Sequence, residues 1–60
     1  MKAKELFGLI CVEHKRTGKP VPRSYVVEKC CGNVELMKSL VNELILIGSI
    51  LSTPAGYVVK

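Results

Sequence analysis

The fold of this chain is decided by residues 33–48, which read Asn-Val-Glu-Leu-Met-Lys-Ser-Leu-Val-Asn-Glu-Leu-Ile-Leu-Ile-Gly. The large apolar residues of this stretch recur at spacings of three and four, the pattern of an amphipathic helix with one buried face. They are Met37, Leu40, Val41, Leu44 and Ile45. Asn33 is a good N-cap, Glu35 complements the positive end of the helix, and Gly48 is a typical C-terminal signal. The stretch therefore predicts a helix between Asn33 and Gly48.

A second, shorter helix is predicted immediately upstream, from Pro22 to about Cys31. Pro20 and Pro22 exclude the preceding residues from a helix interior, but Pro22 suits a first helical turn. The inward positions expected are Tyr25 or Val26 with Cys30, and Val27 with Cys31. Gly32 breaks this helix, so about two residues join it to the next one. Val21, between the two prolines, is expected to form a one-residue bridge to a sheet.

The N-terminal segment, Lys2 to Thr17, predicts another amphipathic helix. Its apolar face has the same three- and four-residue steps. That face consists of Ala3, Leu6, Phe7, Ile10 and Cys11, widened by Leu9 and Val12. Lys15 and Arg16 occupy the last turn, where cations favour the helix dipole, and Gly18 is a natural terminator.

The last segment, Ser49 to Lys60, predicts two short strands around Pro54-Ala55-Gly56. Ile50 and Ser52 alternate with Leu51 and Thr53, and the residues after the turn, Tyr57-Val58-Val59, favour strands. A turn that contains proline and glycine between such runs indicates a β-hairpin.

The expected architecture is therefore α+β: one domain over residues 1–60, with three helices followed by a C-terminal hairpin. The second and third helices form a helix-turn-helix, and the hairpin takes the place of a wing. Residues 37–50 and 52–59 carry a resemblance to the winged helix-turn-helix transcription regulators. The chain is most similar to the bacterial repressors of iron–sulfur and cysteine metabolism genes and to the multiple-antibiotic-resistance regulators. The resemblance implies that Leu40 and Leu44 are core, that Gly48 precedes the wing, and that the helix before it reads DNA.

Three features depart from that family. Gly32 stands where an apolar turn residue is usual, and Ser49 replaces an apolar residue at the start of the wing. No long C-terminal helix of the kind that many relatives use to dimerise follows the wing. The cluster-binding cysteines of the iron–sulfur members also have no counterpart, so the resemblance implies no iron–sulfur cofactor.

Composition favours a polyanionic partner and a second subunit. The 60 residues are 48% hydrophobic and carry a net charge of +4. Such a charge on a small domain favours nucleic acid, and the apolar excess suggests a homodimer that reads two DNA half-sites.

The longest apolar stretch, Leu44 to Leu51, is far shorter than the roughly 20 residues of a membrane span. Because no signal peptide is recognisable, we expect a complete cytoplasmic chain that contacts no membrane.

The three cysteines, Cys11, Cys30 and Cys31, are a poor disulfide framework because their number is odd and two are adjacent. A metal site built from these thiols and His14 is the alternative, but no C-x-x-C pair is present. We expect buried or half-buried free thiols and no metal or cofactor. Cys11 and His14 could pair on one helix, but no third group accompanies them, so neither an enzyme nor a small-molecule substrate is expected.

The candidate DNA-binding residues lie on three elements. On the third helix they are Asn33, Val34, Glu35, Lys38, Ser39 and Asn42. Asn42 can pair with adenine, Lys38 with guanine or phosphate, Glu35 with cytosine, and Val34 can touch a thymine methyl. The alternative is that these residues are only the solvated face of an amphipathic helix.

Phosphate contacts are expected from the second helix and the wing. Arg23 and Ser24 begin the second helix, where a guanidinium and backbone amides can hold a phosphate, although Arg23 could equally be a surface charge. Thr53 and Lys60 could follow the backbone or the minor groove. Lys15, Arg16 and Lys19 are treated as solubilising first and phosphate-binding second.

These observations favour a sequence-specific double-stranded DNA-binding protein, a small transcription regulator of the phage or plasmid repressor or excision-factor kind. The alternative is a winged-helix protein-interaction module that does not bind DNA. The acidic residues Glu35 and Glu43 on the third helix favour that alternative.

Overall fold

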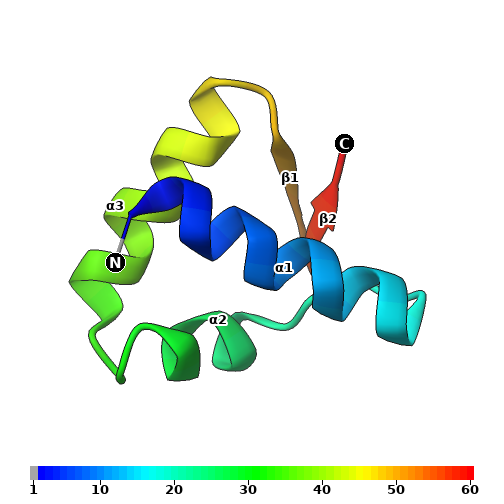
Figure 1. Ribbon diagram of the computed structural model, residues 1–60, viewed down its shortest axis with the longest axis horizontal. Helices are drawn as coiled ribbons and strands as arrows, with labels where there is room; N and C mark the ends of the chain where they lie inside the picture. The colour runs from blue at the N-terminus through cyan, green and yellow to red at the C-terminus, as the bar shows by residue number, and fades with distance from the viewer. Residues whose placement is uncertain (1) are drawn as a thin grey trace.

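The computed structural model describes residues 2–60 and contains three helices followed by a two-stranded hairpin. The helices are α1 (Ala3–Thr17), α2 (Arg23–Lys29) and α3 (Val34–Leu46), and the strands are β1 (Ile50–Thr53) and β2 (Gly56–Val59). In Figure 1, α1 crosses the middle of the view, with α2 below it, α3 at the left and the hairpin at the right. The α+β fold predicted from the sequence is confirmed, and the order of the elements is consistent with a winged-helix topology.

Helix α1 begins after Lys2, whose backbone N–H donates to the Glu5 carboxylate at 3.3 Å. It ends at Gly18, whose N–H donates to the carbonyl of His14 at 2.8 Å. Its buried residues are Ala3, Leu6 and Ile10. Val12 is 66% exposed, so the prediction that it widens the buried face is wrong. The reason is geometric: Val12 is two positions from Ile10, and positions two apart on a helix do not share a face.

Helix α2 is shorter than predicted, ending at Lys29 rather than about Cys31. Its end is closed by two hydrogen bonds, from Gly32 N–H to Val27 O (2.9 Å) and from Cys31 N–H to Glu28 O (3.0 Å). This is the Schellman pattern, which places Cys31 in the left-handed region, with φ of 57°. Cys31 is therefore exposed, and its predicted inward position is wrong. Four residues, rather than about two, join α2 to α3.

Helix α3 has both of the terminal signals that the sequence predicted. The Asn33 side chain accepts a hydrogen bond from the Leu36 N–H at 3.0 Å, as an N-cap does. At the other end Ser49 N–H donates to Leu44 O (2.9 Å) and Gly48 N–H donates to Ile45 O (3.0 Å). This second Schellman motif turns the chain out of α3 and directly into β1.

The hairpin is antiparallel, and its register pairs Ile50 with Val59 and Thr53 with Gly56. A third segment joins it, because Val21 and Tyr57 form the isolated bridge that the prolines around Val21 suggested. Gly56 has φ of 142°, and a Cβ atom there would lie 2.7 Å from the Val21 carbonyl carbon. A glycine is therefore required where the hairpin meets the α1–α2 connection.

All five elements and Val21 contribute to one apolar core. Its members are Ala3, Leu6, Ile10, Val21, Val26, Cys30, Met37, Val41, Leu44, Ile50 and Tyr57. Helix α1 packs against α3, α2 and the strand β2, so the inner face of α3 is held against the rest of the molecule. Within residues 2–60, no helix is both long and apolar enough to cross a membrane.

Candidate nucleic-acid interface

Helix α3 presents a continuous solvent-exposed face opposite its core side. Met37, Val41 and Leu44 are buried beneath α1 and the hairpin, which fixes the rotation of the helix about its axis. Every predicted α3 site residue is exposed, namely Asn33, Val34, Glu35, Lys38, Ser39 and Asn42. The structure therefore brings this predicted set together on one surface. It also shows that the side-chain oxygen of Asn33 is engaged in capping the helix.

The charge on this face is mixed. Within residues 34–46, Lys38 is the one cation, whereas Glu35 and Glu43 are both exposed carboxylates on the same helix. Val34 is 45% exposed at the N-terminal end of α3 and is not a member of the core. The face can thus donate and accept hydrogen bonds and make apolar contacts, but its own electrostatic attraction for a polyanion is small.

Arg23 lies beside a surface hollow of about 410 Å³ between the start of α2 and the hairpin turn. The hollow is lined by Pro22, Arg23 and the hairpin residues 52–57. Among residues 2–60 the salt bridge found joins Arg16 to Glu13, which leaves the Arg23 guanidinium without a carboxylate partner there. Helix α2 has only seven residues, so any attraction for an anion at this hollow comes mainly from the Arg23 side chain. Ser24 follows Arg23 and is exposed.

The two predicted wing residues lie at opposite ends of the hairpin. Thr53 closes the turn: its hydroxyl donates to Gly56 O at 2.7 Å and accepts from Gly56 N–H at 3.1 Å. Its polar group is therefore satisfied within the turn. Lys60 follows the open end of the hairpin, where its N–H donates to Ser49 O at 3.1 Å. The structure does not bring Thr53 and Lys60 together, because the length of the strands separates them.

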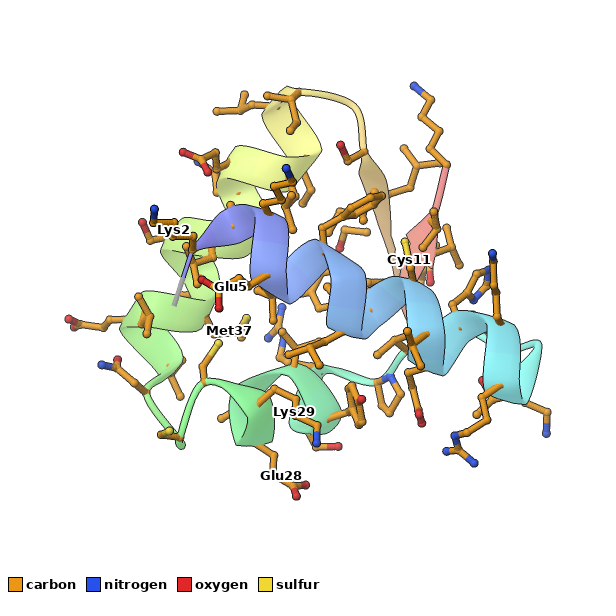
Figure 2. The ribbon with its side chains drawn as sticks, viewed as in Figure 1. Lys2, Glu5, Cys11, Glu28, Lys29 and Met37 are labelled. Atoms are coloured by element: carbon orange, nitrogen blue, oxygen red, sulfur yellow. The ribbon has the colours of Figure 1, made fainter. Side chains whose placement is uncertain are left out.

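Two of the basic residues on α1 and α2 have local roles. The Arg16 guanidinium donates to the Glu13 carboxylate at 2.9 and 2.8 Å. That hydrogen bonding, more than the charge of Arg16, lowers the pKa of the exposed Glu13 carboxyl. On α2, the Lys29 ammonium lies 5.3 Å from the centre of the Tyr25 ring, a cation–π contact. Figure 2 shows Glu28 and Lys29 projecting from α2 on the edge away from the hairpin.

The thiols and the histidine do not converge. Cys11 is half-buried, Cys30 is buried and Cys31 is exposed, so the expectation of a buried or half-buried thiol is wrong for Cys31 alone. In Figure 2 Cys11 lies toward the hairpin, well apart from the α2–α3 turn that carries the other two. Burial raises the pKa of the Cys30 thiol, and the neighbouring Cys31 raises it further. His14 Nδ1 lies 2.9 Å from Lys19 O, a local contact at the C-terminal end of α1. Within residues 2–60, no group of three or more metal-binding side chains gathers.

One surface feature went unrecognised in the sequence, although its signal was present. Leu46 and Ile47 are 78% and 67% exposed at the C-terminal end of α3, and Leu51 is 45% exposed on β1. The signal is the uninterrupted uncharged run from Leu44 to Leu51. An amphipathic helix followed by a half-buried strand does not require all of these positions to be apolar.

No protein-family model, curated protein or solved structure matches this chain with significance. The class of protein is accordingly defined by topology: three helices and a C-terminal antiparallel hairpin packed on them, consistent with a winged helix.

Proposed function

We propose that this protein is a cytoplasmic transcription regulator that binds double-stranded DNA by inserting the exposed face of α3 into the major groove. The observation that carries the proposal is the composition of that face. Lysine and asparagine are residue types that read base edges in the major groove, and Lys38 and Asn42 are both exposed here, as is Val34, whose apolar side chain suits a thymine methyl. All three lie on a helix whose opposite side is fixed by the core.

Phosphate attraction comes mainly from outside α3. The chain carries nine Lys and Arg against five Asp and Glu, and most of the surplus lies on α1, α2 and their connection. Arg23 is unpaired among the described residues and adjacent to the hairpin turn, and it is the cation that we expect to contact the phosphate backbone flanking the groove. Of the regulator types, a phage or plasmid repressor or an excision factor fits a DNA-reading unit of this size.

Under this proposal Arg23 contacts phosphate and Asn42 reads a base. Fluorescence anisotropy tests these two roles with a duplex selected for tight binding and with a duplex of random sequence. Arg23→Ala should weaken both duplexes alike and reduce the salt slope by roughly one unit per lost phosphate contact. Asn42→Ala should cost about 1–3 kcal/mol on the selected sequence and little on random DNA, because only base reading is lost. Lys4→Ala, which removes one charge from α1, is the matched control for Arg23→Ala and should have the smaller effect.

A folded Arg23→Ala/Lys38→Ala/Asn42→Ala variant with unchanged affinity for DNA would falsify this placement of the site. All three side chains are exposed and none is a core residue, so the triple variant should fold. Circular dichroism checks that it does.

A protein-docking module is the second candidate, and one observation favours it. The exposed face of α3 carries Glu35 and Glu43 and continues through Asn42 to the exposed Leu46 one turn later. A groove in another protein can accept such a face as readily as DNA can. A chain that shows no salt-dependent shift with any duplex would support this second function over the first.

A further inference from the structure

Among residues 2–60, three of the five exposed large hydrophobic side chains lie within six residues of one another, on the two sides of the α3–β1 connection. They are Leu46 and Ile47 at the end of α3 and Leu51 on β1, which we name the corner patch. Only Gly48 and Ser49 separate α3 and its C-cap from β1. Val58, half-buried, extends the patch because it is the cross-strand partner of Leu51. The other two exposed hydrophobics, Val12 and Val34, lie away from this corner, on α1 and at the start of α3.

The corner patch has a glutamate beside its helical part and a lysine beside the α3–β1 connection. Glu43 lies three and four residues before Leu46 and Ile47, so it is their neighbour on the helix surface. Lys60 lies beside the α3–β1 connection, because its N–H donates to Ser49 O at 3.1 Å. Figure 1 shows the end of β2 and the α3–β1 connection on the same edge of the molecule, the edge opposite α2.

A surface of this kind is complementary to itself. In a two-fold interface each contact occurs twice, with residue i of one copy meeting residue j of the other and the reverse. An apolar centre bordered by Glu43 and by Lys60 then forms two equivalent ion pairs around buried leucines. We propose that the corner patch is the homodimer interface of this protein, and that its partner is a second copy of the same chain.

The expected dimer is weak in the absence of DNA. The described chain exposes 4010 Å² in all, and a standard interface of about 800 Å² per partner would cover roughly one fifth of it. The corner patch consists of a few side chains at one corner, so it belongs at the small end of the interface scale. Such interfaces support reversible association rather than an obligate dimer.

The interface also sets a distance, and this step rests on the proposed DNA-binding function. Lys38 lies nine residues before Ile47, roughly 14 Å along the axis of α3. Two such segments that met end to end would place the two Lys38 positions about 28 Å apart along a common axis, to which the side chains between the two helix ends add. Two half-sites one helical turn apart require about 34–36 Å. A dimer through the corner patch would therefore separate the two Lys38 positions by a distance of the order that two half-sites require.

Sedimentation velocity without DNA, at concentrations up to about 1 mM, tests the interface. The wild-type protein should show concentration-dependent dimerisation, and Leu46→Ser/Leu51→Thr should weaken it by at least tenfold. Val12→Ser is the matched control: it makes the same kind of change at a side chain of similar exposure on α1, and it should dimerise as the wild type does. Because these side chains are exposed, circular dichroism should show all variants folded.

A charge exchange tests the pairing across the two-fold axis. Glu43→Lys and Lys60→Glu should each weaken dimerisation about tenfold, because each places like charges together at two symmetric positions. The double variant should recover most of the wild-type affinity. Wild-type protein that is monomeric throughout, or a dimer that responds to Val12→Ser and not to the patch variants, overturns the proposal. A monomer that still binds duplex DNA would overturn the interface and leave the proposed function standing.

Discussion

The turn between α2 and α3 contains backbone strain that a single substitution should relieve. Cys31 has φ of 57° although it carries a side chain, a conformation that costs a non-glycine residue about 1–2 kcal/mol. Its thiol is exposed, and its N–H bond to Glu28 O does not depend on the side chain. Cys31→Gly removes the strain but adds chain entropy to the unfolded state, which offsets about 0.4–1 kcal/mol. We expect a net gain of about 0.5–1 kcal/mol in the free energy of unfolding, or roughly 4–8 °C in Tm for a domain of this size.

Urea denaturation followed by circular dichroism, in the presence of a reductant, measures this gain. Cys31→Ala is the control, because it removes the thiol and keeps the left-handed strain, so its stability should stay close to that of the wild type. Gly32→Ala is the reciprocal change. Gly32 has φ of 76°, and an added methyl group would meet open space, so the variant should lose about 1 kcal/mol through the backbone alone.

The comparison between the two Cys31 variants tests whether position 31 is held in the left-handed region in solution. If Cys31→Gly is no more stable than Cys31→Ala, the turn does not hold position 31 in the left-handed region in solution. The Schellman end of α2 would then need to be revised, together with the angle at which α3 leaves the turn.

Three further predictions concern other parts of the fold. Asn33→Ala should lower the free energy of unfolding by about 1 kcal/mol through loss of the α3 cap, whereas Asn33→Ser should restore most of it, as urea titration would show. Gly56→Ala should cost about 2–3 kcal/mol, because its methyl would press against the Val21 backbone; a loss no greater than that of Gly48→Ala, which meets only open space, would contradict the close approach. Burial raises the pKa of Cys30 in the folded state, so the unfolded state loses its proton first: stability should hold below about pH 8.5 and fall as the pH rises above it. A Cys30→Ala variant should show a shallower alkaline fall, and thiol-reactive reagents should label Cys31 before Cys30 in the native protein.

The sequence alone was sufficient to predict the helices, the hairpin and their order, because each is specified by local chemistry. Asn33 and Gly48 mark the ends of α3 through hydrogen bonds that span only a few residues. The prolines around Val21 exclude a helix there, and the single bridge to Tyr57 followed from that exclusion. The exposed residues of α3 could also be predicted from local sequence. Its apolar residues recur every three or four positions on one face, so Lys38, Ser39 and Asn42 lie on the opposite face.

The tertiary structure alone decided which apolar residues are covered and which polar groups remain free. The apolar period places Leu6, Phe7 and Leu40 alike on inner helix faces, yet Leu6 is fully buried and the other two are only partly buried, because exposure depends on which surfaces of other elements reach each position. The same holds for Thr53, whose hydroxyl the turn geometry satisfies, and for Arg23, which packing leaves beside the hairpin hollow. Local patterns specify elements over a few residues, whereas burial is a property of the assembled surfaces. The corner patch emerges only once α3 and the hairpin are joined, because Leu46 and Leu51 lie on elements that the Gly48 turn brings to one edge.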